Sequence, residues 1–205
     1  MKNKGVLYAL CAGISWGISL GIFGRTMTSF GFTAMQVSAV RTTISAITFI
    51  ILALVTDRKA FRLNPKDIWI FLCSGFISVT LFCWCYFTST RLCSLAVGGV
   101  LQYTAPMWVV VLSAVIFKEP ITKVKAAAMA IAIAGCVLVS GITHGVGQVS
   151  AFGLVAGVFS GITYGSYTIF TRFAVPKYRT MTINVYTFIV ASATSLLLSG
   201  PVKTV

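Results

Sequence analysis

The chain has 205 residues, of which 58% are hydrophobic and only 9% are charged, and its formal net charge is +13. A soluble domain carries about 25% charged residues and cannot bury so large an apolar share, so the composition excludes an ordinary soluble protein. In lipid, every backbone N–H and C=O group must be paired within the chain. The apolar runs are long and continuous, which favours membrane-spanning helices over a closed barrel of short alternating strands.

Seven apolar runs reach the length of about 20 residues that a transmembrane helix needs. In chain order they extend from Gly5 to Phe23, Thr33 to Val55, Ile68 to Phe87, Cys93 to Phe117, Val124 to Ile142, Gly153 to Phe173 and Met181 to Leu198. The first run is longer than the apolar region of a signal peptide, so it is interpreted as a retained span. Short connections favour antiparallel neighbours, and the sequence therefore predicts an all-α integral membrane bundle.

Lys and Arg are distributed unevenly between the two sets of loops. With the N-terminus in the cytoplasm, twelve basic residues lie inside and three, Arg25, Arg91 and Lys203, lie outside. The positive-inside rule therefore predicts a multi-pass protein of a bacterial-type inner membrane with a cytoplasmic N-terminus. The loop over residues 141–150, which holds His144, carries no Lys or Arg, as an outside loop can. This distribution, with no face that is both aromatic and basic, argues against nucleic acid as a partner.

The sequence repeats itself at an offset of 148 residues. Gly5, Gly13, Ile14 and Gly17 match identical residues in the later copy, where Thr163 replaces Ser15, Tyr164 replaces Trp16 and Asn184 replaces Gln36. Five spans separate the copies, so they enter the membrane from opposite sides, as in the inverted repeats of many secondary transporters. The predicted units are a complete five-helix repeat over residues 1–145 and an incomplete two-helix repeat over 146–205. A full second repeat would give about 290 residues and ten spans, so a truncated chain is expected, to be completed by further C-terminal spans or by a homodimer.

Glycines at four-residue spacing mark the two matched spans. Gly13 and Gly17 lie in the first span, and Gly161 and Gly165 in the sixth. Small residues at this spacing let two helix backbones approach closely, so these four are expected to be packing residues. A smooth, tightly packed helix pair could also rock during a transport cycle.

Arg41 is the one charge placed deep within a span. An arginine at the bilayer centre costs about 2.5–3.5 kcal/mol, so it must either snorkel to the membrane surface or line a cavity inside the bundle. In a cavity, its guanidinium would suit a carboxylate or phosphate group.

Pro106 lies in the middle of the fourth span, where it is expected to kink the helix and free the carbonyl of Gln102. Freed backbone at this depth must be buried in protein or face water, so either a plain kink or a bend that lines a site is expected. The proposed transport path lies between the repeats. Its predicted lining is Trp16, Arg41, Tyr86, Gln102, Tyr103 and Tyr164, and the alternative is that these residues only pack a solid bundle or form an aromatic belt.

No enzymatic or metal-binding constellation is recognised. The three acids, Asp57, Asp67 and Glu119, are at the edges of loops, where Glu119 would face the start of the fifth span or pair with Lys118. The six cysteines are interpreted as buried small hydrophobes, with no metal and no disulfide framework. No cofactor is expected, and a membrane-embedded enzyme is the less favoured alternative.

The segment from Tyr86 to Val109, followed by the segment from Val115 to Pro120, resembles the EamA domain of the drug/metabolite transporter superfamily, as do the Trp16-Gly17 pair and Arg41. This resemblance implies a ten-span carrier with a central cavity between two repeats. It implies export or uptake of amino acids, other metabolites or toxic organic compounds. The function expected is secondary transport of a small metabolite through the cytoplasmic membrane, by export and alternating access. The alternative is an inactive or partner-dependent membrane fragment.

Overall fold

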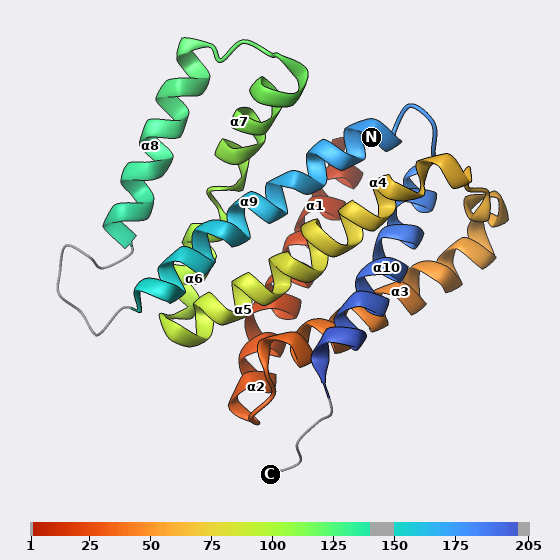
Figure 1. Ribbon diagram of the computed structural model, residues 1–205, viewed down its shortest axis with the longest axis horizontal. Coiled ribbons are helices and arrows are strands. Elements are labelled where there is room, and N and C mark those ends of the chain that lie inside the picture. The colour runs from red at the N-terminus through yellow and green to blue at the C-terminus, as the bar shows by residue number, and fades with distance from the viewer. Residues whose placement is uncertain (1, 140–149, 201–205) are drawn as a thin grey trace.

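The computed structural model describes residues 2–139 and 150–200, and the predicted outside loop with His144 falls outside these residues. The described part is helical throughout, without a strand (Figure 1). Its elements are α1 (Lys2–Gly17), η1 (Ile18–Phe23), α2 (Gly24–Ser29), α3 (Ala34–Thr56), η2 (Arg58–Phe61), η3 (Pro65–Asp67), α4 (Ile68–Cys73), η4 (Ser74–Leu81), α5 (Phe82–Leu92), α6 (Leu95–Gln102), α7 (Ala105–Phe117), α8 (Lys123–Val139), α9 (Ala151–Ala174) and α10 (Thr180–Ser199). This confirms the prediction of an all-α membrane bundle.

Four stretches in the described residues are long and apolar enough to cross a membrane: Ala34–Thr56, Pro65–Leu92, Leu95–Phe117 and Thr180–Ser199. They correspond to the second, third, fourth and seventh predicted spans. The other three predicted spans also contain helices, namely α1 with η1, α8 and α9. The chain is therefore a multi-pass membrane protein, and the number of seven spans stays a prediction.

The centre of the bundle is formed by two rods that run side by side, α9 and the continuous α4–η4–α5 segment (Figure 1). α10 packs against α3 and η4, so both helices of the second predicted unit contact helices of the first. The α7–α8 hairpin lies at the opposite edge from α3 and α10 (Figure 1). The cavity described below lies where α3, η4, α5, α9 and α10 meet.

Hydroxyl groups join α10 to its neighbours. Their oxygen atoms lie 2.7–3.3 Å apart in the pairs Ser38–Ser195, Thr43–Ser192, Ser74–Thr187 and Thr80–Thr194. In a membrane, short polar side chains of this kind hold helices together because lipid offers them no alternative partner. Close approach is also required at Gly75, where an added Cβ would lie 2.7 Å from the carbonyl oxygen of Thr187.

α3 starts with a capping box. The Thr33 backbone N–H donates to Oε1 of Gln36 at 2.9 Å, and the Gln36 N–H donates to the Thr33 hydroxyl at 3.3 Å. This arrangement satisfies two of the backbone donors that a helix start leaves unpaired. It gives Gln36, the residue that the repeat aligned with Asn184, a local structural role.

The fourth predicted span is broken at Pro106, not merely kinked. α6 ends at Gln102, and α7 starts at Ala105 with Pro106 in its first turn. Proline is accommodated in the first turn of a helix, where its missing N–H would have no partner in the helix. The Thr104 hydroxyl donates to the carbonyl of Leu101 at 2.6 Å and thereby closes the end of α6.

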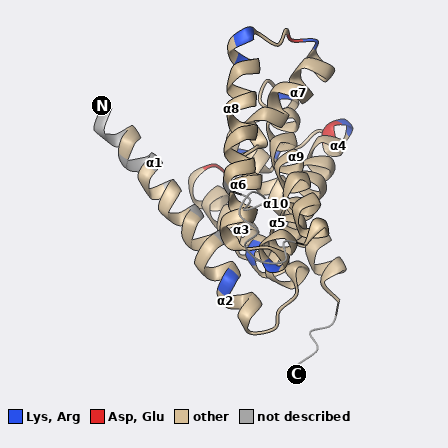
Figure 2. Ribbon diagram, turned by 90° about the vertical axis from the view of Figure 1, so that its left-hand side faces the viewer, with Lys and Arg blue, Asp and Glu red and all other residues tan. Residues whose placement is uncertain are grey.

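α1 projects away from the other helices (Figure 2). A Cβ added at Gly13 or Gly17 meets nothing within 4 Å among the described residues, whereas one at Gly161 lies 2.4 Å from the Thr104 hydroxyl oxygen and one at Gly165 lies 3.0 Å from a carbonyl. The close packing expected of these glycines is therefore present in α9 but finds no neighbour on α1. The superposition of the two spans as inverted copies stays a prediction.

Candidate functional site

A cavity of about 270 Å³ lies between five elements of the bundle. α3, η4, α5, α9 and α10 supply its lining, which consists of Arg41, Phe49, Ser78, Val79, Phe82, Tyr164, Tyr167 and Phe188. Most of this surface is aromatic or aliphatic, with one cation and a few hydroxyl groups. A pocket of this composition can hold an apolar group by contact and orient a polar group through a small number of hydrogen bonds.

Arg41 is half-buried and held at the cavity wall by two neighbours. Its Nε donates to the hydroxyl of Ser19 at 2.9 Å, and its Nη1 donates to Sγ of Cys83 at 3.1 Å. Ser19 belongs to η1 and Cys83 to α5, so the guanidinium is fixed between two other helices. Arg41 therefore lies at the wall of this cavity, and its role in binding a substrate stays a prediction.

Two of the elements around Arg41 are π-helical. η1 carries Ser19, and η4 carries the cavity residues Ser78 and Val79. π-Helical turns are uncommon and often occur at functional sites, because the wider turn redirects side chains. In this protein both segments place a serine close to the cavity or to its arginine.

Two pairs of aromatic rings contribute to the wall of the cavity. Phe49 and Phe188 are stacked with ring centroids 5.1 Å apart, and Phe82 and Tyr164 are tilted at the same separation. Tyr86 packs behind Phe82 with ring centroids 5.9 Å apart and is 4% exposed. These pairs are in the range of favourable aromatic contacts, so they fix the shape of the wall.

Hydrogen bonds between helices fix the polar part of the lining. The hydroxyl oxygens of Ser78 and Ser166 lie 2.7 Å apart and link η4 to α9. The Tyr167 hydroxyl donates to Oδ1 of Asn184 at 3.1 Å and links α9 to α10. The first link joins the two predicted units, and the second joins the two helices of the second unit. The lining therefore depends on η4, α9 and α10 all being in place.

The predicted lining residues lie in different parts of the structure. Arg41 and Tyr164 line the cavity together, and Tyr86 is buried in the second layer behind it. Gln102 is buried at the end of α6 and Tyr103 is 71% exposed, and neither is among the residues that line this cavity, so their place on the transport path stays a prediction. The backbone of Trp16 lies in α1, and its side chain is outside the described part of the structure.

Several lining residues were missed by the sequence reasoning. Tyr167 lies three positions after Tyr164, so helical spacing could have identified it as a neighbour on the same face. Ser78 is a hydroxyl in the middle of a predicted span, which is also a recognisable signal. Phe49, Phe82 and Phe188 carry no such signal, because aromatic residues are common on every face of a membrane helix.

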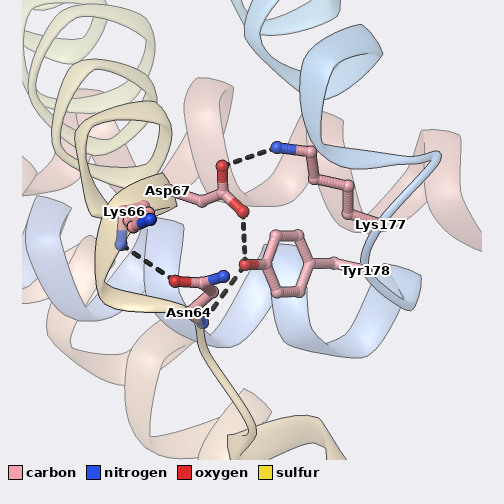
Figure 3. Close-up of polar contacts among 5 residues, drawn as sticks. All are labelled: Asn64, Lys66, Asp67, Lys177 and Tyr178. Atoms are coloured by element: carbon pink, nitrogen blue, oxygen red, sulfur yellow. Dashed lines mark hydrogen bonds and ion pairs between the residues drawn. The ribbon is translucent and has the colours of Figure 1, made fainter.

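The three acids lie just after α3, at the end of η3 and just after α7, and each forms an ion pair with a basic residue in α9 or in the segment that joins α9 to α10. Asp57 pairs with Arg179 at 2.8 Å, Asp67 pairs with Lys177 at 2.7 Å, and Glu119 pairs with Arg172. Figure 3 shows that Asp67 also accepts a hydrogen bond from the Tyr178 hydroxyl, at 2.8 Å. We refer to these seven residues as the ion-pair network. It corrects the expected partner of Glu119, which is Arg172 and not Lys118.

The ion-pair network places its three loops on one side of the bundle. The charge count assigns the same loops to one side of the membrane, independently of the structure. The hydrogen bond from Arg179 lowers the pKa of the Asp57 carboxyl below its ordinary value, and the hydrogen bond to Asp67 raises the pKa of Lys177. Both groups are therefore charged at neutral pH.

The six cysteines differ in how exposed they are. Cys83 and Cys85 are buried, Cys73, Cys93 and Cys136 are half-buried, and Cys11 is exposed. The expectation that all six are buried is therefore wrong, since an apolar thiol on a membrane helix can equally face lipid. Within the described residues no three His, Cys, Asp or Glu side chains converge as a metal site would require.

Comparison with known proteins gives one match. The profile of the EamA-like transporter family matches residues 3–141, which lie within the first predicted repeat. No curated protein and no solved structure matches the chain. The matched region contains five of the eight residues that line the cavity, and it extends over more than half of the chain. The chain therefore belongs to the EamA-like transporter family, a family of membrane transporters of small solutes.

Proposed function

We propose that the protein exports a small metabolite, either an amino acid or a related amphipathic compound with a carboxylate, through the cytoplasmic membrane, and that the cavity around Arg41 is its binding site. The observation that carries the proposal is the guanidinium of Arg41 at the wall of an aromatic cavity. Arginine binds carboxylates through paired N–H donors, and the aromatic part of the wall suits an apolar side group. In this proposal the N-terminus is cytoplasmic.

The size of the cavity supports a small substrate. Its volume of about 270 Å³ lies just below the range typical of pockets for drug-sized ligands, about 300–1,000 Å³. A large organic compound would need a wider cavity. The volume is therefore better matched to a metabolite of amino-acid size than to a bulky toxic compound.

The ion-pair network supports alternating access, because it could act as a gate at one end of the bundle. Its three pairs join the ends of α3, η3 and α7 to α9 and to the α9–α10 connection, and the basic side chain of each pair is 49–63% exposed. Exposed ion pairs contribute little net stability, so they can separate during each cycle without unfolding the protein. In this mechanism, the network closes the cytoplasmic end while substrate leaves from the other end.

The test is uptake into inside-out membrane vesicles that contain the full 205-residue chain, with a radiolabelled amino-acid hydrolysate as the probe. Replacing Arg41 by glutamine removes a charge-assisted hydrogen bond, worth about 1.5–3 kcal/mol, so uptake should fall by roughly 10- to 100-fold at low substrate concentration. The matched control is Arg62→Gln, which removes the same charge from an exposed side chain outside the cavity. Membrane expression and elution from a sizing column should be equal in the two variants.

Each outcome has a defined meaning. Normal uptake by folded Arg41→Gln protein would contradict the assignment of the binding site. Uptake that is absent in the wild type, for amino acids and for other small carboxylates, would contradict export by this chain alone and favour the partner-dependent fragment. Restoration of uptake by co-expressing three further spans would then identify the missing partner.

A further inference from the structure

A second cavity lies at the other end of the α4–η4–α5 rod from the ion-pair network. Its volume is about 410 Å³. We call it the arginine pocket, and it is lined by Arg25, Thr28, Phe87, Thr90, Arg91, Ser94, Leu95 and Ala96. These residues come from α2, the end of α5 and the start of α6. Neither the family match nor the proposed transport site assigns a role to this pocket.

Two arginines share this pocket without an acidic partner among the described residues. The chain has only three acids, and all of them pair with basic residues of the ion-pair network. Figure 2 shows the same separation, because the basic segments at α2 and near α5 have no acidic segment beside them. Arg25 and Arg91 are also two of the three basic residues that the charge count leaves on the outside. Two like charges lining one pocket repel each other, and a bound anion would relieve this repulsion.

The hydroxyl groups of the pocket show which donors are available. The Thr28 hydroxyl donates to the carbonyls of Gly24 and Arg25, and the Thr90 hydroxyl donates to the carbonyl of Phe87. Ser94 differs, because its oxygen accepts from the Val97 N–H at 3.1 Å and its own hydrogen can point into the pocket.

The side-chain donors toward a ligand are therefore two guanidinium groups and one serine hydroxyl. A carboxylate has two oxygens to accept these hydrogen bonds, whereas a phosphate group has three or four. Guanidinium also matches phosphate geometry through paired N–H groups. Phe87 and Leu95 add an apolar wall, beside which a glycerol or acyl portion could lie.

We propose that the arginine pocket binds a phosphate group, with Arg25 and Arg91 as paired donors and Ser94 as a third. The group can come from a free phosphate in water or from the headgroup of an anionic phospholipid at the membrane surface. Binding at this pocket does not depend on transport through the Arg41 cavity. If the arginine pocket did not bind phosphate, the proposed transport function would be unaffected. If the transport function were wrong, phosphate binding at the arginine pocket would be equally unaffected.

The test measures binding to the purified full chain in neutral detergent by calorimetry, at constant ionic strength maintained with chloride. Three probes are titrated: inorganic phosphate, short-chain phosphatidylglycerol and short-chain phosphatidylcholine. Arg25→Gln/Arg91→Gln should lower the affinity for the binding probe by about tenfold or more, since each arginine contributes a charge-assisted contact. The control, Arg58→Gln/Arg62→Gln, removes the same charge from exposed loop residues and should leave the affinity unchanged.

The probes distinguish the two sources of phosphate. Binding of both inorganic phosphate and phosphatidylglycerol, in competition, indicates a site for phosphate itself, and binding of phosphatidylglycerol alone indicates a lipid site. Phosphatidylcholine should bind more weakly, because its choline cation lies beside the phosphate. The proposal would be overturned if the three probes bound with equal affinity, or if the two double variants bound the same probe with equal affinity.

A measurement on the wild-type protein avoids dependence on the folding of the variants. Phenylglyoxal modifies accessible arginines, and mass spectrometry of peptides gives the rate at each one. The probe that binds should slow modification of Arg25 and Arg91 while leaving Arg58 and Arg62 unchanged. If the probe left the modification rate of Arg25 and Arg91 unchanged, the proposed site would be wrong.

Discussion

Gly75 is a position at which the bundle has no room for one added methyl group. A Cβ at this residue would lie 2.6 Å from Cβ of Val190 and 2.7 Å from the carbonyl oxygen of Thr187. Ordinary contact begins at 3.4 Å, so α10 would have to move away from η4 by about 0.8 Å (3.4 − 2.6 Å). Neither neighbouring atom can rotate away, because one is backbone and the other is attached directly to it.

Overpacking of this kind costs about 1–3 kcal/mol. The better helix propensity of alanine offsets about 1 kcal/mol of that cost, so the net loss for Gly75→Ala is about 0–2 kcal/mol. For a chain of this size, such a loss lowers the unfolding midpoint by up to about 8 °C. The midpoint can be measured in detergent from the loss of the monodisperse sizing-column peak after heating.

The matched control is Gly99→Ala, because a Cβ at Gly99 meets nothing within 4 Å. This change should leave the midpoint unchanged or raise it slightly, since alanine favours the helix. Equal midpoints for the two variants would refute the claim that α10 and η4 are in close contact. Because η4 and α10 also line the Arg41 cavity, Gly75→Ala should in addition lower transport at temperatures where it remains folded.

Three further predictions follow from the same structure. Gly161→Ala should destabilise the protein in detergent and Gly13→Ala should not, although the repeat aligns these residues, because only Gly161 has a close neighbour; equal effects would show that α1 packs as tightly as α9. The stabilising Asp57–Arg179 pair should persist at neutral pH and disappear as the pH falls below the ordinary carboxyl value of 3.8 and through the lowered pKa of Asp57, so the midpoint difference between wild type and Asp57→Asn should vanish in acid. In a cysteine-free background, cysteines at Asp57 and Arg179 should be labelled from the cytoplasm and one at Arg91 from outside, and the reverse pattern would invert the proposed orientation.

The sequence alone determined the class of the protein and the positions of most helices. Long apolar runs with few charges can only be buried in lipid, and lipid requires the backbone to pair within helices. This argument depends on composition and local order, so it does not need tertiary contacts. The sidedness of the basic loops is also local, and the family resemblance rested on the order of short segments.

Only the tertiary structure decided which residues meet. Arg41 was recognisable because a buried charge is costly wherever it lies, but Ser19, Cys83 and Phe188, which surround its cavity or hold its guanidinium, look like ordinary membrane-helix residues. The ion-pair network was hidden for a related reason. Its acids and bases are separated by 53 to 122 positions in the sequence, and the pairing depends on how α9 and α10 pack against the earlier helices.

The glycines show most directly the difference between what the local sequence predicts and what tertiary packing determines. The sequence gives Gly13 and Gly161 matching positions in two similar segments, so local pattern predicts the same packing for both. In the structure, a methyl group would clash at Gly161 and meet open space at Gly13. Spacing reveals that a helix can be approached closely, but the partner and the distance depend on long-range packing, which the local sequence does not specify.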